Sequence, residues 1–185
     1  MPYLIAAVVL VGALCLLDLL LTVGLVRRLR AEQARGPHPS AQPIDDDGML
    51  PPGALVGAFE TRTLDGRPLG RRDLDTGTVV VFMSPGCPPC HEKLPRVAAA
   101  LRATRADAAL VVIAGGPADD PDTRGMIEEL APVARVVHES IDGPVTEAFA
   151  ARAFPVMCRV RAVGDELVVE AVGDRVLPAL VPAAS

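Results

Sequence analysis

The segment that most constrains the fold of this chain is a run of five apolar residues, 79–83, followed at once by the sequence Ser-Pro-Gly-Cys-Pro-Pro-Cys-His. The run is β-branched at its start and contains no polar residue, which is typical of a strand buried in the centre of a sheet. From residue 88 to about residue 105, apolar residues recur at helical intervals. Cys87 and Cys90 are therefore predicted to lie where a central strand gives way to a helix.

Strands and helices alternate along the rest of this region. Strands are expected at 58–63, 108–116, 135–140, 155–163 and 166–172, and helices at 123–134, 144–153 and 175–183. Asp65-Gly66 predicts a turn after the first strand, and Gly164-Asp165 predicts a hairpin between the last two. This order predicts an α/β domain with a mixed central sheet.

The N-terminal residues differ in composition from the rest. Residues 3–26 are an apolar run with one charge, Asp18, and about 20 residues suffice to cross the ~30 Å hydrocarbon layer. The run has neither the basic leader nor the short apolar core of a cleavable signal peptide. Residues 1–35 are therefore predicted to be an uncleaved single-pass membrane anchor with a basic flank. Asp18 is either a contact for a redox partner within the membrane or a tolerated carboxyl.

The remaining residues divide into a linker and one domain. Residues 36–53 are rich in Pro, Gly and Asp and lack periodicity, which predicts a linker. Residues 54–185 then form a soluble domain of common size. The net charge of −5, the 3% aromatic content and the absence of Trp argue against a nucleic-acid-binding surface.

The Cys-x-x-Cys spacing is compatible with three kinds of chemistry. A structural zinc site needs four ligands, and outside this pair Cys158 and His138 stand alone, so no metal site is expected. Cys87 to His91 also matches the attachment sequence for c-type haem. Met126 and Met157 are the available distal ligands for that haem. A membrane-anchored c-type cytochrome is thus an alternative, although such domains are mainly helical and this motif follows a strand.

A redox dithiol explains more of the pattern. At a helix N-terminus the macrodipole favours the thiolate of Cys87, and Cys90, one turn on, can attack a mixed disulfide. Pro88 and Pro89 fit the first helical positions and remove two N–H donors from that turn. His91 either faces the same sulfur or is a solvated surface residue.

The sequence VVVFMSPGCPPCHEKLP resembles the active-site segment of membrane-anchored thioredoxin-like thiol–disulfide oxidoreductases. Within them, the methylamine dehydrogenase accessory protein (MauD) group is most similar, and the likeness extends over the anchor, the linker and most of residues 54–174. The resemblance implies a thioredoxin-like fold, catalytic Cys87 and Cys90, no dissociable cofactor and protein thiol or disulfide substrates. It also implies a role in the maturation of an extracytoplasmic protein.

The resemblance further implies that Pro155 is a cis-proline facing the dithiol and that Phe154 and Pro155 bind the substrate backbone. Thioredoxins carry a buried acid where this chain has Val81, and Trp where it has Gly86. Loss of the acid removes a proton relay and so argues against rapid general disulfide reduction, and the bulk of Phe154 suggests a narrower range of partners. A peroxiredoxin-like thiol peroxidase is a lesser alternative, since the upstream proline of that class is absent.

The compartment is predicted differently by two arguments. Four arginines follow the apolar run, at positions 27, 28, 30 and 35, and the positive-inside rule then places the domain in the cytoplasm. The resemblance implies an extracytoplasmic domain at the cell membrane. The second placement is favoured, because stable redox disulfides suit an oxidising compartment.

Overall fold

The computed structural model describes residues 48–177. The predicted membrane segment 3–26, its basic flank and most of the predicted linker lie outside these residues. Between residues 48 and 177, no helix has both the length and the apolar character needed to cross a membrane.

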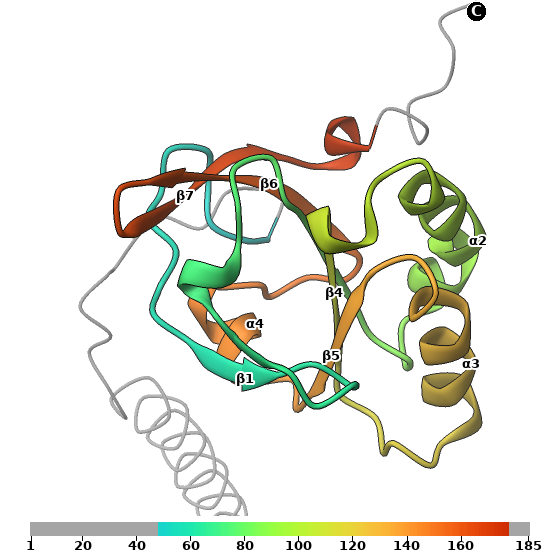
Figure 1. Ribbon diagram of the computed structural model, residues 1–185. Coiled ribbons are helices and arrows are strands. Elements are labelled where there is room, and N and C mark those ends of the chain that lie inside the picture. The colour runs from blue at the N-terminus through green and yellow to red at the C-terminus, as the bar shows by residue number, and fades with distance from the viewer. Residues whose placement is uncertain (1–47, 178–185) are drawn as a thin grey trace, which may run out of the picture. The chain divides into compact units, whose positions relative to one another are not determined.

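A five-stranded mixed sheet forms the centre of the domain (Figure 1). In spatial order it consists of β5 (Arg135–Glu139), β4 (Ala109–Ala114), β3 (Val79–Met83), β6 (Val156–Val163) and β7 (Glu166–Val172). The β3, β4 and β5 strands run parallel, and β6 is antiparallel to both β3 and β7. The mixed central sheet predicted from the sequence is thus confirmed.

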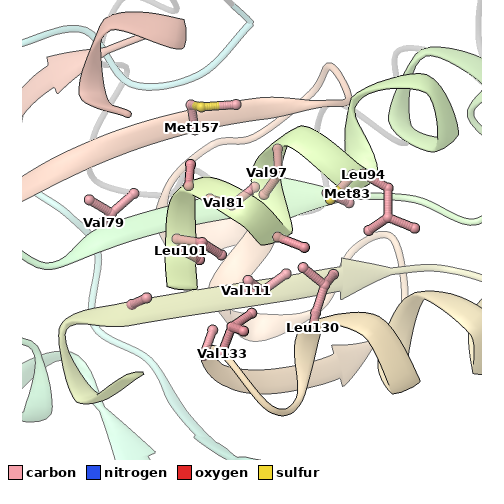
Figure 2. Packing of buried hydrophobic residues seen from close by; sticks show 14 of the residues in the cluster. Val79, Val81, Met83, Leu94, Val97, Leu101, Val111, Leu130, Val133 and Met157 are labelled. Carbon is pink, nitrogen blue, oxygen red and sulfur yellow. The ribbon is translucent and has the colours of Figure 1, made fainter. Parts of the chain in front are cut away.

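Two helices cover one face of this sheet, α2 (Pro88–Arg102) and α3 (Pro121–Leu130) (Figure 1). Their apolar residues meet those of the strands in one buried cluster, which Figure 2 shows around Val81, Val111 and Met157. Every residue of β3 and β4 is buried, because helices or loops cover both faces of these central strands.

The opposite face packs against α4 (Pro144–Ala148) and a small hairpin of β1 (Glu60–Arg62) and β2 (Pro68–Gly70). Aromatic rings mark this second cluster: the ring centroids of Phe82 and Phe149 are 5.4 Å apart. The turn predicted at Asp65-Gly66 lies between β1 and β2, where Gly66 has a φ of +82°. A positive φ is readily adopted by glycine, which has no Cβ.

Helix boundaries differ from the sequence expectation at several ends: α2 ends at Arg102 and α3 at Leu130, before the expected residues 105 and 134. The α3 helix begins two residues early, because the Asp120 carboxylate accepts hydrogen bonds from the N–H groups of Asp122 and Thr123. The α4 helix ends at Ala148 rather than at residue 153. Ala150 follows with a φ of +48°, which no α-helix contains.

The two ends of the described region also depart from expectation. Residues 48–53 were predicted as linker, yet Met49 is fully buried and Leu50 nearly so in the cluster beneath β3. Because proline and glycine surround Met49 and Leu50, the composition of this stretch predicted a linker and gave no sign that these two residues belong to the core. At the other end, a short 3₁₀ helix spans Asp174–Val176, and most of the helix expected at 175–183 lies outside the described residues.

Candidate active site

The two cysteines of the motif lie together at the start of α2. Cys87 is the N-cap residue of this helix and is half-buried, whereas Cys90 is fully buried one turn further on. Both are free thiols, and their Sγ atoms are 2.6 Å apart. The predicted juncture of central strand and helix therefore brings the two sulfur atoms into contact.

The two sulfur atoms differ in their surroundings. Cys87 Sγ donates a hydrogen bond of 3.1 Å to the carbonyl oxygen of Phe154. Cys90 Sγ accepts one of 3.5 Å from the backbone N–H of Ser84. Burial, together with the hydrogen bond to Cys87, raises the pKa of Cys90 to about 12. At neutral pH, Cys90 is therefore held as a thiol beneath the more accessible Cys87.

The loop before β6 faces this pair. The peptide bond between Phe154 and Pro155 is cis, as the resemblance to thioredoxin-like proteins implied. Val156 pairs with Phe82 in the register of β6 and β3. Since β3 runs toward the cysteines and β6 runs antiparallel to it, the start of β6 must lie beside the end of β3. This register brings Cys87 and Phe154, which are 67 positions apart in the sequence, into contact.

The tuning residues expected near the dithiol occupy defined positions. Pro88 and Pro89 are the first two residues of α2, as predicted. The ring of His91 is half-buried, and its Nε2 lies 2.6 Å from the carbonyl oxygen of Pro85. This differs from both expectations for His91, a contact with the Cys87 sulfur and a solvated side chain. The imidazole instead bonds the backbone of the loop that leads to the dithiol.

Two features of the site were not found from the sequence. Lys93, the sole lysine of the chain, lies on α2 and forms an ion pair of 3.0 Å with Asp174. Its charge opposes the effect of burial on the pKa of Cys90. The Phe154 contact to Cys87 is made by a backbone carbonyl, which no side-chain pattern identifies.

Position 81, where thioredoxins carry a buried acid, is filled by a packed apolar side chain. Val81 is fully buried and lies in register with Val111 of β4 and Met157 of β6. It belongs to the same apolar cluster as Cys90. No carboxylate therefore takes the place of the thioredoxin acid at this position.

The other chemically interesting residues lie apart from the dithiol. Cys158 is fully buried in the cluster on the opposite face of the sheet, and burial raises its pKa. The ring of His138 lies 3.0 Å from the carbonyl oxygen of Gly116. Among residues 48–177, no three His, Cys, Asp or Glu side chains gather in a way that could hold a metal ion. Met126 and Met157 are buried in the cluster beneath α2 and α3.

Comparisons with known proteins give a match at the level of structure alone. No protein-family model matches the chain, and no curated protein matches it in sequence. The solved structure of MTB dsbF in its mixed oxidized and reduced forms has a TM-score of 0.50 at 20% identity and covers 66% of this chain and 95% of that chain.

Two further solved structures are similar. The thioredoxin domain of a thiol-disulfide oxidoreductase from Bacteroides vulgatus has a TM-score of 0.49 at 20% identity, covering 71% of this chain and 96% of that chain. A secreted Mycobacterium tuberculosis disulfide oxidoreductase homologous to DsbE of E. coli has a TM-score of 0.48 at 18% identity, covering 66% and 93%. With the sheet order and the dithiol geometry described above, the match to dsbF shows that residues 48–177 adopt the thioredoxin-like fold.

Proposed function

We propose that this protein is a thiol–disulfide oxidoreductase that exchanges a Cys87–Cys90 disulfide with protein substrates. The observation that carries the proposal is the contact between the two sulfur atoms, 2.6 Å apart at the N-terminus of α2. Two thiols this close can be joined and separated with little movement of the backbone. The names of the similar solved structures agree with this chemistry, although their low identity shows the fold alone.

The reaction follows from the different burial of the two sulfur atoms. In the reducing direction, the Cys87 thiolate attacks a substrate disulfide, and one substrate sulfur leaves as a thiolate. Cys90 then loses its proton and attacks Cys87 Sγ, which releases the second substrate thiol. Two electrons pass to the substrate, and the Cys87–Cys90 disulfide remains. The oxidising direction is the reverse of these steps.

Phe154 and Pro155 form the proposed binding edge for the substrate backbone. The Phe154 carbonyl already accepts a hydrogen bond from Cys87, so a segment bound along this loop would lie beside the reacting sulfur. The Phe154 side chain packs against both apolar clusters and is partly buried. The bulk of this side chain, on the residue whose carbonyl contacts the sulfur, supports a narrower range of partners than a small residue would allow.

The rate of the second step is expected to be modest on general substrates. Cys90 must lose a proton although its pKa is raised to about 12 by burial. Val81 stands where an acid would relay that proton. The departing substrate thiolate is then the base at hand, which favours substrates whose sulfur stays close after the first step.

We further propose that residues 3–26 tether the domain to the cell membrane, with the dithiol on the extracytoplasmic side. The sequence of the apolar run and the resemblance to the MauD group support this placement, and so does the redox chemistry. Asp18 is the proposed contact for a membrane redox partner. A topology reporter fused after residue 185 tests the orientation, and cytoplasmic activity of the reporter would contradict it.

The activity itself is tested with purified full-length protein in insulin reduction and in exchange with a peptide disulfide. We expect turnover that depends on Cys87 and Cys90 and is retained in Cys158→Ala. A Soret absorption band in the purified protein would support the cytochrome alternative instead. The buried positions of Met126 and Met157 and the bond of His91 to Pro85 do not favour that alternative.

Rapid turnover of hydrogen peroxide by Cys87 alone, without Cys90, would support the peroxidase alternative. The buried Cys90 in contact with Cys87 favours the two-cysteine exchange reaction over it.

A further inference from the structure

A short segment at the N-terminal end of the described chain lies against the loop that faces the dithiol. We call residues Gly48–Leu50 the strap and residues Ala150–Pro155 the site loop. The Gly48 carbonyl oxygen accepts a hydrogen bond of 2.7 Å from the backbone N–H of Arg152. The backbone N–H of Leu50 donates one of 3.1 Å to the carbonyl oxygen of Phe149. The strap is thus bonded both within the site loop and at the residue before it.

The strap is held firmly by the domain. Met49 is fully buried and Leu50 is 5% exposed, in the same cluster as Phe149 and Ala151. Downstream of the strap, the N–H groups of Gly53 and Val56 donate to the carbonyl oxygens of Val169 and Leu167 in β7. The strap and the residues that follow it, up to Val56, therefore join the site loop to the edge strand β7 of the central sheet.

The site loop itself needs such support. Ala150 has a φ of +48°, a conformation that a residue with a side chain keeps only when its surroundings fix it. Four residues later, the Phe154 carbonyl contacts Cys87 Sγ at 3.1 Å. Between these two points, the hydrogen bond from Arg152 to Gly48 ties the loop to the strap.

Gly48 lies close to the site loop. A Cβ added at Gly48 would lie 2.5 Å from the Cβ of Ala153, the residue that precedes Phe154. That distance is too short for two carbon atoms, so either the strap or the site loop would have to move. Gly48 also has a φ of +75°, which disfavours any side chain there.

From this geometry we propose that Gly48 is a positioning residue, whose close contact with Ala153 sets the place of the Phe154 carbonyl at the Cys87 sulfur. The inference rests on the proposed function for its consequence in catalysis. Its structural content, the coupling of the strap to the reactivity of Cys87, is independent of that function.

Displacement of the site loop should affect two reactions of Cys87 in opposite directions. The Phe154 carbonyl oxygen lies 3.1 Å from the half-buried Cys87 Sγ, so displacement of the loop should open that side of the sulfur and speed alkylation of Cys87 by iodoacetamide, by roughly threefold or more. A misplaced binding edge should slow exchange with insulin, lowering kcat/KM by about tenfold, chiefly through KM. General loosening of the fold would also expose Cys87 to alkylation, so a control variant with the same backbone strain is needed to separate the two causes.

The chain offers a matched control for the substitution. Gly53 has a φ of +89°, similar to that of Gly48, but a Cβ added there would meet nothing within 4 Å. Gly53→Ala therefore carries the same kind of backbone strain without the contact to the site loop. Ala153→Gly removes the Ala153 Cβ and leaves the backbone N of residue 153, at 3.3 Å, as the nearest atom to the added Cβ. Gly48→Ala/Ala153→Gly therefore relieves the severe part of the clash while keeping the strain.

The experiment compares wild type, Gly48→Ala, Gly53→Ala and Gly48→Ala/Ala153→Gly as full-length proteins. Alkylation of the Cys87 peptide is followed by mass spectrometry, and insulin exchange is followed as separate kcat and KM values. We expect the opposed changes in Gly48→Ala, values within about twofold of wild type in Gly53→Ala, and recovery in the double variant.

Equal changes in Gly48→Ala and Gly53→Ala, an unchanged Cys87 alkylation rate in Gly48→Ala, or no recovery in the double variant would overturn the proposal. If wild type shows no insulin exchange, the proposed function fails, and the alkylation rates alone still decide the role of the strap.

A second pair of variants covers the case in which Gly48→Ala does not fold. Met49 and Leu74 are both buried in the same apolar cluster, but only Met49 belongs to the strap. Met49→Ala should speed Cys87 alkylation, because a cavity beneath the strap loosens it, and Leu74→Ala should not. Equal alkylation rates in these two variants would contradict the proposal.

Discussion

Cys87 and Cys158 lie near two neighbouring strands of one sheet, yet their surroundings differ sharply. Cys158 lies inside β6, opposite Val80 of β3, and is fully buried. Cys87 lies just beyond the end of β3, where the chain turns into α2 and the sulfur meets both Cys90 and the site loop. The difference shows that position at a strand end, and not residue type, makes a cysteine available for chemistry.

The largest expected effect separates these two cysteines directly. Cys87→Ser should lower kcat/KM for disulfide exchange by about 10³-fold or more, because it removes the attacking sulfur. Cys158→Ala should leave exchange nearly unchanged in protein that remains folded. Insulin reduction measures both. Loss of exchange in folded Cys158→Ala would contradict the assignment of Cys87 as the reacting thiol and of Cys158 as an unreactive core residue.

The second prediction concerns the division of work between Cys87 and Cys90. Cys90→Ser should still form the bond between Cys87 and a substrate sulfur but should not resolve it. A mixed disulfide should therefore accumulate, visible on a non-reducing gel and lost on addition of dithiothreitol. Turnover should fall by about 10²-fold or more. Absence of the adduct, with Cys87 intact, would show that Cys90 is not the resolving thiol.

The third prediction concerns the effect of the buried Cys158 thiol on the pH dependence of stability. Burial raises the pKa of Cys158 above the unfolded value of about 8.5, so its stabilising contribution is complete below that pH and is lost as pH rises. Above about pH 8.5 the unfolded state releases a proton that the folded state keeps, and the free energy of unfolding falls by up to about 1.4 kcal/mol per pH unit.

Urea unfolding of wild type and Cys158→Ala between pH 8 and pH 10 measures this slope. The slope should be shallower in the variant by up to that amount, whatever the variant costs in stability at pH 7. Identical slopes would show that the Cys158 thiol ionises as readily in the fold as outside it.

The smallest expected effect concerns the charge of Lys93, which acts on the pKa of Cys90 and not on that of Cys158. Burial raises the pKa of Cys90, and the Lys93 charge opposes that shift. Lys93→Met should therefore move the alkaline rise in the rate of mixed-disulfide resolution to higher pH. Because the pair with Asp174 is partly exposed, the stability cost should be at most about 1 kcal/mol. An unchanged pH profile would show that the Lys93 charge does not affect the ionisation of Cys90.

Most of the central sheet and the placement of the dithiol could be predicted, because they depend on local patterns. Val79–Met83 is apolar throughout, and prolines begin the next helix, so strand, turn and helix are all encoded within 24 residues of each other. The cis peptide at Pro155 followed from the resemblance and is present in the structure.

Features that depend on tertiary contact could not be predicted in this way. Met49 and Leu50 stand among prolines and glycines, so only the fold shows that they are core residues. The sequence alone does not show which group the His91 ring contacts. Its bond to the carbonyl oxygen of Pro85 depends on the path of the loop between β3 and α2. The close approach of Gly48 to Ala153 joins residues over a hundred positions apart, which no local pattern records.

The most direct test of the proposed function is to map the disulfides of the full-length protein across a glutathione redox titration. Peptide mass spectrometry should show one reversible two-electron transition, in which Cys87 and Cys90 become linked to each other while Cys158 remains a thiol. A disulfide that involves Cys158, or two cysteines of the motif that stay reduced under oxidising conditions, would contradict the exchange mechanism.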